Sequence, residues 1–194
     1  AIDFRGGAYS FGDLTLDAPG FGLIDGTAVT LNAHDLTLAN SSTDLGACDG
    51  ATTAACGTGA LTINAHEIAF GSGTIRTYGY GANVTLASAT GIFAQGKGGF
   101  DAGPAAFSIQ APFIGDRAVA LLPGEEALIP ALALTTTGQM TVSNPTGAEA
   151  GDIEGTPGGS IALSGGDVSI LGGTIRATAG ELDITSGHSL VVAD

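Results

Sequence analysis

A short pattern of polar, aliphatic and small residues recurs along the chain. Each copy has a polar residue, an aliphatic residue, a second polar residue and two small or turn-forming residues, as in Thr62-Ile63-Asn64-Ala65-His66. Alternating polar and apolar positions predict a short β-strand with one buried side. The aliphatic residues of the eight copies, which we expect to stack in one buried ladder, are Leu16, Leu31, Ile63, Leu86, Ile109, Val142, Leu163 and Ile184.

The spacing of the copies predicts a repeated structural unit. The copies begin at Thr15, Thr30, Thr62, Thr85, Ser108, Thr141, Ala162 and Asp183. Most neighbouring copies therefore follow a period of about 21–23 residues, which is typical of a solenoid. A second apolar segment follows many copies, for example Leu36-Thr37-Leu38 or Ile68-Ala69-Phe70. Two or three short strands per period, separated by Gly, Ser or Asn, are typical of one coil of a parallel β-helix. We therefore predict an all-β fold, a β-solenoid whose stacked coils share one core.

A third segment occurs twice with the same four residues. Gly73-Thr74-Ile75-Arg76 and Gly173-Thr174-Ile175-Arg176 each place their Thr at the same offset from the first residue of the preceding copy, Thr62 or Ala162. We therefore expect the two strings to occupy the same position in different coils.

Two longer gaps, from Thr30 to Thr62 and from Ser108 to Thr141, predict loop insertions near residues 39–59 and 115–132 within one domain of residues 1–194. Cys48 and Cys56, the only two cysteines, lie in the first insertion. A local disulfide is the simplest account of this pair, and a reduced structural pair is the alternative. A disulfide would indicate an oxidising compartment.

Residues 190–194 still have the pattern of a strand, so we expect the chain to be a segment of a longer protein.

Composition and charge narrow the classes of function. Only 12% of residues are charged and 33 are Gly, so helix formers are scarce. The net charge of −14 repels phosphate backbones and predicts no nucleic-acid partner. No apolar run approaches the ~20 residues that a bilayer requires, so we expect no membrane insertion.

An acidic, Trp-free surface suits a secreted, extracellular protein. Its Asp and Gly turns, such as Asp101-Ala102-Gly103, could attract Ca²⁺ weakly, and we expect no other cofactor.

Two runs point to a known family. Leu61-Thr62-Ile63-Asn64-Ala65-His66-Glu67-Ile68 and Gly159-Ser160-Ile161-Ala162-Leu163-Ser164-Gly165-Gly166 resemble the shaft of filamentous haemagglutinin-like exoproteins, and the resemblance covers roughly residues 12–194. It implies a right-handed parallel β-helix, two-partner secretion and a bacterial surface fibre that contacts glycans or proteins of a host or neighbouring cell. The family's secretion domain carries an Asn-Pro-Asn-Gly signature, whereas the nearest string here is Asn144-Pro145-Thr146-Gly147. The resemblance therefore implies a shaft segment.

Two pairs of residues are candidate binding sites. His34-Asp35 and His66-Glu67 occupy equivalent positions in consecutive copies, near the ~4.8 Å spacing of paired strands. Two imidazoles beside two carboxylates could bind a transition metal, and a solvated polar corner is the alternative, so we predict no metal site. Tyr78 and Tyr80, flanked by Gly, could contact a glycan or protein, and aromatic packing at a corner is their alternative.

Catalysis has one candidate region, the second insertion. Asp116-Arg117 and Glu125-Glu126 could cleave a polysaccharide with paired carboxylates. The chain contains no Trp, the side chain best suited to stacking on a sugar ring, so we predict that the protein is not an enzyme.

The leading hypothesis for the function is a structural and adhesive segment of a surface fibre. A self-assembling filament subunit joined end to end is the alternative, and a polysaccharide-degrading enzyme is third.

Overall fold

The computed structural model describes residues 1–42, 57–117, 128–150 and 153–193. These residues form strands and turns only, which confirms the prediction of an all-β protein. Within the described ranges there is no helix with the length and apolarity needed to cross a membrane. The strands are β1 (Ile2–Ser10), β2 (Leu14–Asp17), β3 (Gly20–Ala39), β4 (Ala60–Phe70), β5 (Gly73–Tyr78), β6 (Asn83–Ala94), β7 (Lys97–Asp101), β8 (Ala106–Gln110), β9 (Phe113–Asp116), β10 (Ala131–Thr135), β11 (Gln139–Ser143), β12 (Ser160–Ile170), β13 (Thr174–Arg176) and β14 (Glu181–Val192).

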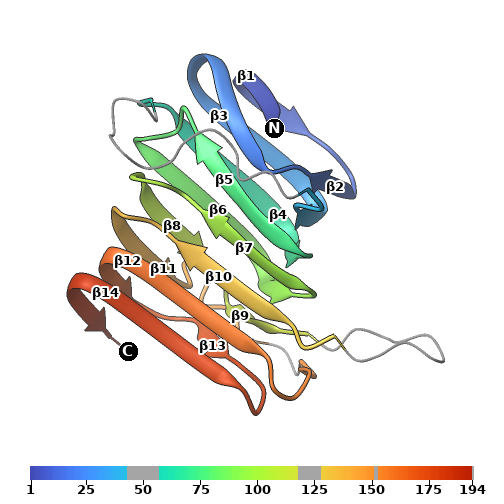
Figure 1. Ribbon diagram of the computed structural model, residues 1–194, viewed down its shortest axis with the longest axis vertical. Helices are drawn as coiled ribbons and strands as arrows, with labels where there is room; N and C mark the ends of the chain where they lie inside the picture. The colour runs from blue at the N-terminus through green and yellow to red at the C-terminus, as the bar shows by residue number, and fades with distance from the viewer. Residues whose placement is uncertain (43–56, 118–127, 151–152, 194) are drawn as a thin grey trace.

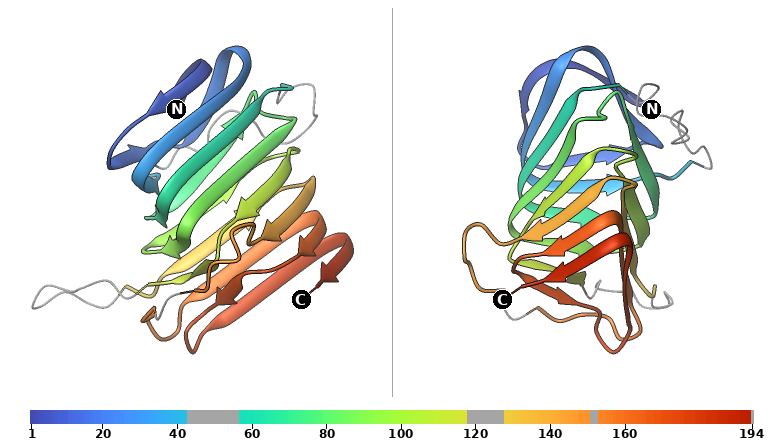
Figure 2. Two further views of the ribbon diagram at one scale, coloured as in Figure 1. Left: turned by 180° about the vertical axis from the view of Figure 1, so that it is seen from behind. Right: turned by 90° about the vertical axis from the view of Figure 1, so that its left-hand side faces the viewer.

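Parallel pairing joins all the strands in one 14-stranded sheet. Eleven strands follow a single path, β1-β3-β5-β7-β10-β12-β11-β8-β6-β9-β13, which curls around the apolar core as a closed parallel barrel. The remaining strands join as branches: β2 pairs with β3, β4 pairs with β3 and β6, and β14 pairs with β12. Figures 1 and 2 show the strands wrapped around the long axis, with β1 and β14 at opposite ends of the molecule.

The prediction of a right-handed parallel β-helix, a solenoid of short repeated coils, is therefore wrong. The structure has one closed sheet in place of a solenoid, and β3 alone runs for 20 residues where the pattern predicts separate short strands. The repeated motif specifies only that a strand has one buried side and a parallel neighbour, which both architectures require. The predicted insertions at 39–59 and 115–132 lie largely outside the described residues.

Inward-facing side chains stack in columns across the sheet, and three of these columns contain the residues discussed below. Column A contains Tyr9, Leu31, Ile63, Leu86, Ile109, Val142, Ile170 and Val192. Column B contains Leu14, Leu36, Ile68, Ile92, Ile114 and Ile175. Column C contains Ile75, Phe100, Leu134, Leu163 and Ile184.

The predicted ladder of eight aliphatic residues is correct only in its middle, from Leu31 to Val142 in column A. Leu16 pairs instead with Leu38. Leu163 and Ile184 belong to column C, and the neighbour of Val142 is Ile170. Because the motif is equally compatible with every column, its recurrence could not assign a strand to one of them.

The middle of the molecule has a continuous apolar core. Ile63, Leu86, Phe100 and Leu134 are all 0% exposed. Aromatic contacts extend the core toward the N-terminal strands. The ring centroids lie 5.8 Å apart for Phe4 and Phe21, 6.4 Å for Phe21 and Phe100, and 5.7 Å for Phe100 and Phe107. This packing fixes the sheet on whose outer face the polar sites lie.

Candidate functional site

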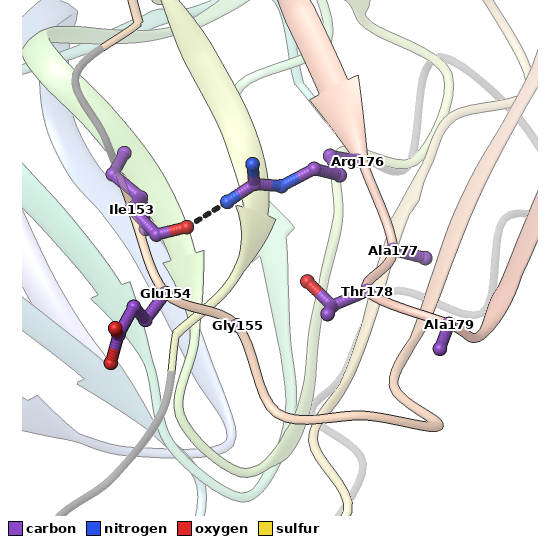
Figure 3. Close-up of a pocket in the computed structure, with 7 residues that line it drawn as sticks. All are labelled: Ile153, Glu154, Gly155, Arg176, Ala177, Thr178 and Ala179. Atoms are coloured by element: carbon purple, nitrogen blue, oxygen red, sulfur yellow. Dashed lines mark hydrogen bonds between the residues drawn. The ribbon is translucent and has the colours of Figure 1, made fainter.

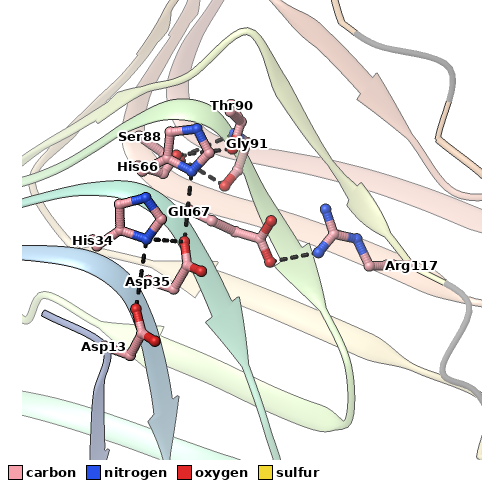
Figure 4. A network of polar contacts seen from close by, with 9 residues as sticks. All are labelled: Asp13, His34, Asp35, His66, Glu67, Ser88, Thr90, Gly91 and Arg117. Carbon is pink, nitrogen blue, oxygen red and sulfur yellow. Dashed lines mark hydrogen bonds and ion pairs between the residues drawn. The ribbon is translucent and has the colours of Figure 1, made fainter.

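Two histidines lie side by side on neighbouring strands β3 and β4 (Figure 4). The strand register pairs Ala33 with Ala65 and Asp35 with Glu67, so His34 and His66 occupy facing positions between these pairs. Their imidazole rings stack with centroids 4.9 Å apart and an angle of 8° between the ring planes. This distance matches the ~4.8 Å spacing of paired strands, so the sheet itself sets the separation of the two rings.

Two aspartates contact the stacked imidazoles. Asp35 Oδ1 lies 3.4 Å from Nδ1 of His34 and 3.5 Å from Nδ1 of His66. Asp13 Oδ1, from the segment before β2, lies 3.5 Å from Nδ1 of His34. The side chains are 64% (His34), 80% (Asp13), 52% (Asp35) and 51% (His66) exposed. Sequence reasoning missed Asp13 because this residue belongs to no copy of the repeated motif.

Glu67 does not join this cluster. Its Oε1 accepts a hydrogen bond of 2.5 Å from Nη1 of Arg117. The Arg117 guanidinium also lies 3.7 Å from the centroid of the Phe93 ring. A cavity of about 440 Å³ opens beside this pair, and its lining includes His66, Glu67, Phe93, Arg117 and Glu149. Arg117, a candidate catalytic residue in the sequence, is therefore the ion-pair partner of Glu67.

Strand β6 holds the backbone of His66 in place. The pairing of β4 with β6 changes register between Ala65 and Glu67, where β6 contains one extra residue. Ser88 Oγ and Thr90 Oγ1, from this bulge, donate hydrogen bonds of 2.9 and 2.8 Å to the carbonyl oxygen of His66. The imidazole of His66 is thus exposed on a backbone that is firmly positioned.

The two tyrosines have different surroundings. Tyr80 is 1% exposed and donates a hydrogen bond of 3.0 Å to the carbonyl oxygen of Gly22. Tyr78 is half-buried and donates a hydrogen bond of 2.6 Å to Asp3 Oδ1. Burial raises the pKa of both phenols above the ordinary value, and the Asp3 carboxylate raises that of Tyr78 further. Only Tyr78 has surface to offer a partner.

Asp116 is fully buried in β9, where it pairs with Ala94. Its Oδ1 accepts a hydrogen bond of 2.9 Å from the backbone N–H of Thr178, while its Oδ2 and the Thr178 hydroxyl have no hydrogen-bond partner among the described residues. Thr178, Glu154 and Arg176 line a neighbouring cavity of about 490 Å³, in which the Arg176 guanidinium donates to the carbonyl oxygen of Ile153 (Figure 3). The buried carboxylate anchors the segment around Thr178.

No family model, curated protein or solved structure matches this chain. The resemblance to the filamentous haemagglutinin-like shaft therefore stays a prediction. The same holds for the two-partner secretion and the bacterial-surface location that it implies.

Several predicted residues lie outside the described part of the chain. These residues are Cys48, Cys56, Glu125 and Glu126. Asp101, in the Ca²⁺ candidate turn, uses both carboxylate oxygens. Its Oδ1 accepts a hydrogen bond of 2.9 Å from the N–H of Gly103, and its Oδ2 lies 3.4 Å from Nε of Arg76. Asp101 is therefore engaged in holding a turn and an ion pair.

Proposed function

We propose that the chain is a structural segment of a secreted extracellular fibre, which presents a rigid sheet surface and lengthens by strand pairing between copies. Although the sheet closes around the core, four described strands, called end strands below, pair on one side only, and they carry the proposal. In the described residues β1 and β2 pair only with β3, β13 pairs only with β9, and β14 pairs only with β12. The unpaired side of such a strand offers backbone N–H and C=O groups to a further strand.

Apolar side chains are exposed on the same end strands. Leu182 and Leu190 in β14 are 45% and 49% exposed, whereas Ile161 and Val168, their partners in β12, are 0% exposed. The difference arises because, among the described residues, β12 has paired strands on both sides, whereas β14 has one on a single side. A strand placed on β14 would bury these side chains, and full burial of such a side chain stabilises by about 1.5–3 kcal/mol.

The strands at the two ends have matching layouts. The first half of β14 pairs alongside Leu163 of column C and its second half alongside Ile170 of column A. In β1 the second half likewise pairs alongside Leu31 of column A, after a first half that pairs with the start of β3. A second copy could therefore place its β1 on β14 in parallel, with the two halves in the same order.

Charge opposes this association and gives it a measurable signature. Each copy carries a formal net charge of −14, so copies repel one another in low salt. The Debye length falls to about 8 Å at physiological ionic strength, which screens much of this repulsion. We therefore expect assembly to increase with salt and with protein concentration.

Light scattering and electron microscopy of the full chain test the proposal. We expect wild-type protein to form linear assemblies at physiological salt, and a Leu190→Lys/Val192→Lys variant to remain monomeric. Ile129→Lys is the matched control, because Ile129 is 51% exposed but lies in none of the end strands. A wild-type protein that stays monomeric at every salt and protein concentration would overturn the proposal, as would equal loss of assembly in the control.

A further inference from the structure

We propose that His34, Asp35 and His66 bind a divalent transition-metal ion on the outer face of β3 and β4. One ligand atom from each of the three residues lies within 4.8 Å of the other two. Zinc binds His nitrogen at about 2.0–2.1 Å and carboxylate oxygen at about 2.0–2.2 Å, so the donors need small movements to converge. All three side chains are exposed and free to make these movements.

The backbone of the site is already organised. Pairing on both sides of His34, at Ala33 with Ala65 and at Asp35 with Glu67, fixes the separation of the two strands. The hydrogen bonds from Ser88 and Thr90 fix the carbonyl of His66. Metal binding would therefore require only side-chain rotation, and the ordering cost would be confined to three side chains.

The contacts within the cluster favour a cation. Nδ1 of both histidines approaches the same oxygen, Asp35 Oδ1. Asp13 supplies a second carboxylate 3.5 Å from Nδ1 of His34, close enough to act as a fourth ligand or to balance the charge of an ion. The strongly acidic chain also raises the local concentration of cations.

The types of donor select the class of metal. Ca²⁺ and Mg²⁺ prefer oxygen ligands throughout, whereas imidazole nitrogen suits Zn²⁺, Cu²⁺ and Ni²⁺. Two imidazoles with one or two carboxylates are an appropriate set for these ions. Glu67 is not part of the set, because Arg117 holds its carboxylate.

Calorimetric titration of the chelator-treated full chain with Zn²⁺ tests the proposal, and the visible spectrum of added Co²⁺ reports the coordination geometry. We expect one ion per chain. His34→Ala, His66→Ala and Asp35→Asn should each weaken binding by at least about tenfold, since loss of even an outer-shell partner of a metal typically costs 10–100-fold.

Three control variants locate the ion. His188→Ala removes an exposed histidine in β14, Glu67→Gln removes a carboxylate next to the cluster, and Cys48→Ser/Cys56→Ser removes both thiols. Each should retain the wild-type affinity. The proposal fails if Zn²⁺ binding does not saturate, if the cysteine variant loses binding while His34→Ala and His66→Ala keep it, or if His188→Ala weakens binding as much as His66→Ala.

Discussion

Gly73-Thr74-Ile75-Arg76 and Gly173-Thr174-Ile175-Arg176 contain the same four residues in different surroundings. The first string forms the start of β5, which pairs with β3 and β7. The second leads into β13, which pairs only with β9 in the described part of the chain. Ile75 is 0% exposed in column C, whereas Ile175 is only partly buried in column B. The same local sequence gives a strand in both places, but the neighbouring strands decide how deeply it is buried.

The comparison also explains why the sequence assigned both strings to one position. Each follows its copy of the motif at the same offset, but the copies differ in place: Thr62 lies beside column A, and Ala162 lies beside column C. After Thr62 the chain passes through column B and then enters column C. After Ala162 it passes through column A and then enters column B. The spacing along the chain therefore correctly gave the number of columns between a motif copy and its string, whereas the column of the motif copy itself depends on long-range strand pairing.

The largest expected difference between the strings lies in their isoleucines. We expect Ile75→Ala to lower the free energy of unfolding by about 2–5 kcal/mol, because it leaves a cavity in a fully buried apolar core. Ile175→Ala should lower it by only about 1 kcal/mol, because surrounding groups and water can fill the space. Urea denaturation followed by circular dichroism measures both variants.

The pair of variants is its own control, since the same side-chain atoms are removed from the same type of strand. Equal losses of stability would contradict the difference in packing between columns B and C. A change in the slope of the urea dependence would instead indicate an altered extent of unfolding.

The glycines that begin the two strings should show the next largest difference. Both have positive φ, 81° at Gly73 and 91° at Gly173, so alanine costs about 1–2 kcal/mol at either position through backbone strain. A Cβ at Gly73 would also overlap the carbonyl oxygen of Asn40, whereas at Gly173 it would lie 2.8 Å from that of Ala111. We expect Gly73→Ala to be the more destabilising variant in thermal unfolding. A larger loss for Gly173→Ala would contradict this ranking.

Much of the strand pattern could be predicted from the sequence, but the closure of the sheet could not. Alternation identified segments such as Leu36-Thr37-Leu38 and Ile68-Ala69-Phe70, and these are neighbouring ends of β3 and β4. The long-range choices, such as the pairing of β5 with β3 and β7, depend on shape and volume across the core. A five-residue motif contains no information about the shape and volume of the side chains on the opposite side of the core.

The candidate site shows the same division. Equivalent positions in consecutive motif copies predicted that His34 and His66 could be adjacent, because register follows directly from the repeat. The contact of Arg117 with Glu67 joins residues 50 positions apart, and no pattern links them. Tyr80 is buried, and its hydroxyl donates a hydrogen bond to the carbonyl oxygen of Gly22. The two residues are 58 positions apart, and no pattern in the sequence links them.

The arginines should give the smallest difference, and salt can separate their roles. Arg76 Nε lies 3.4 Å from Asp101 Oδ2, and both side chains are 29% exposed. The Arg176 guanidinium instead donates to the Ile153 carbonyl and lies 5.3 Å from the centroid of the Phe113 ring. We expect Arg76→Met to cost about 0.5–1 kcal/mol in low salt and less in high salt, because screening already weakens the ion pair that the substitution removes. The cost of Arg176→Met should change little with salt, because its partners carry no net charge. Urea unfolding at two salt concentrations measures this contrast, and the same salt dependence in both variants would show that the two arginines act alike.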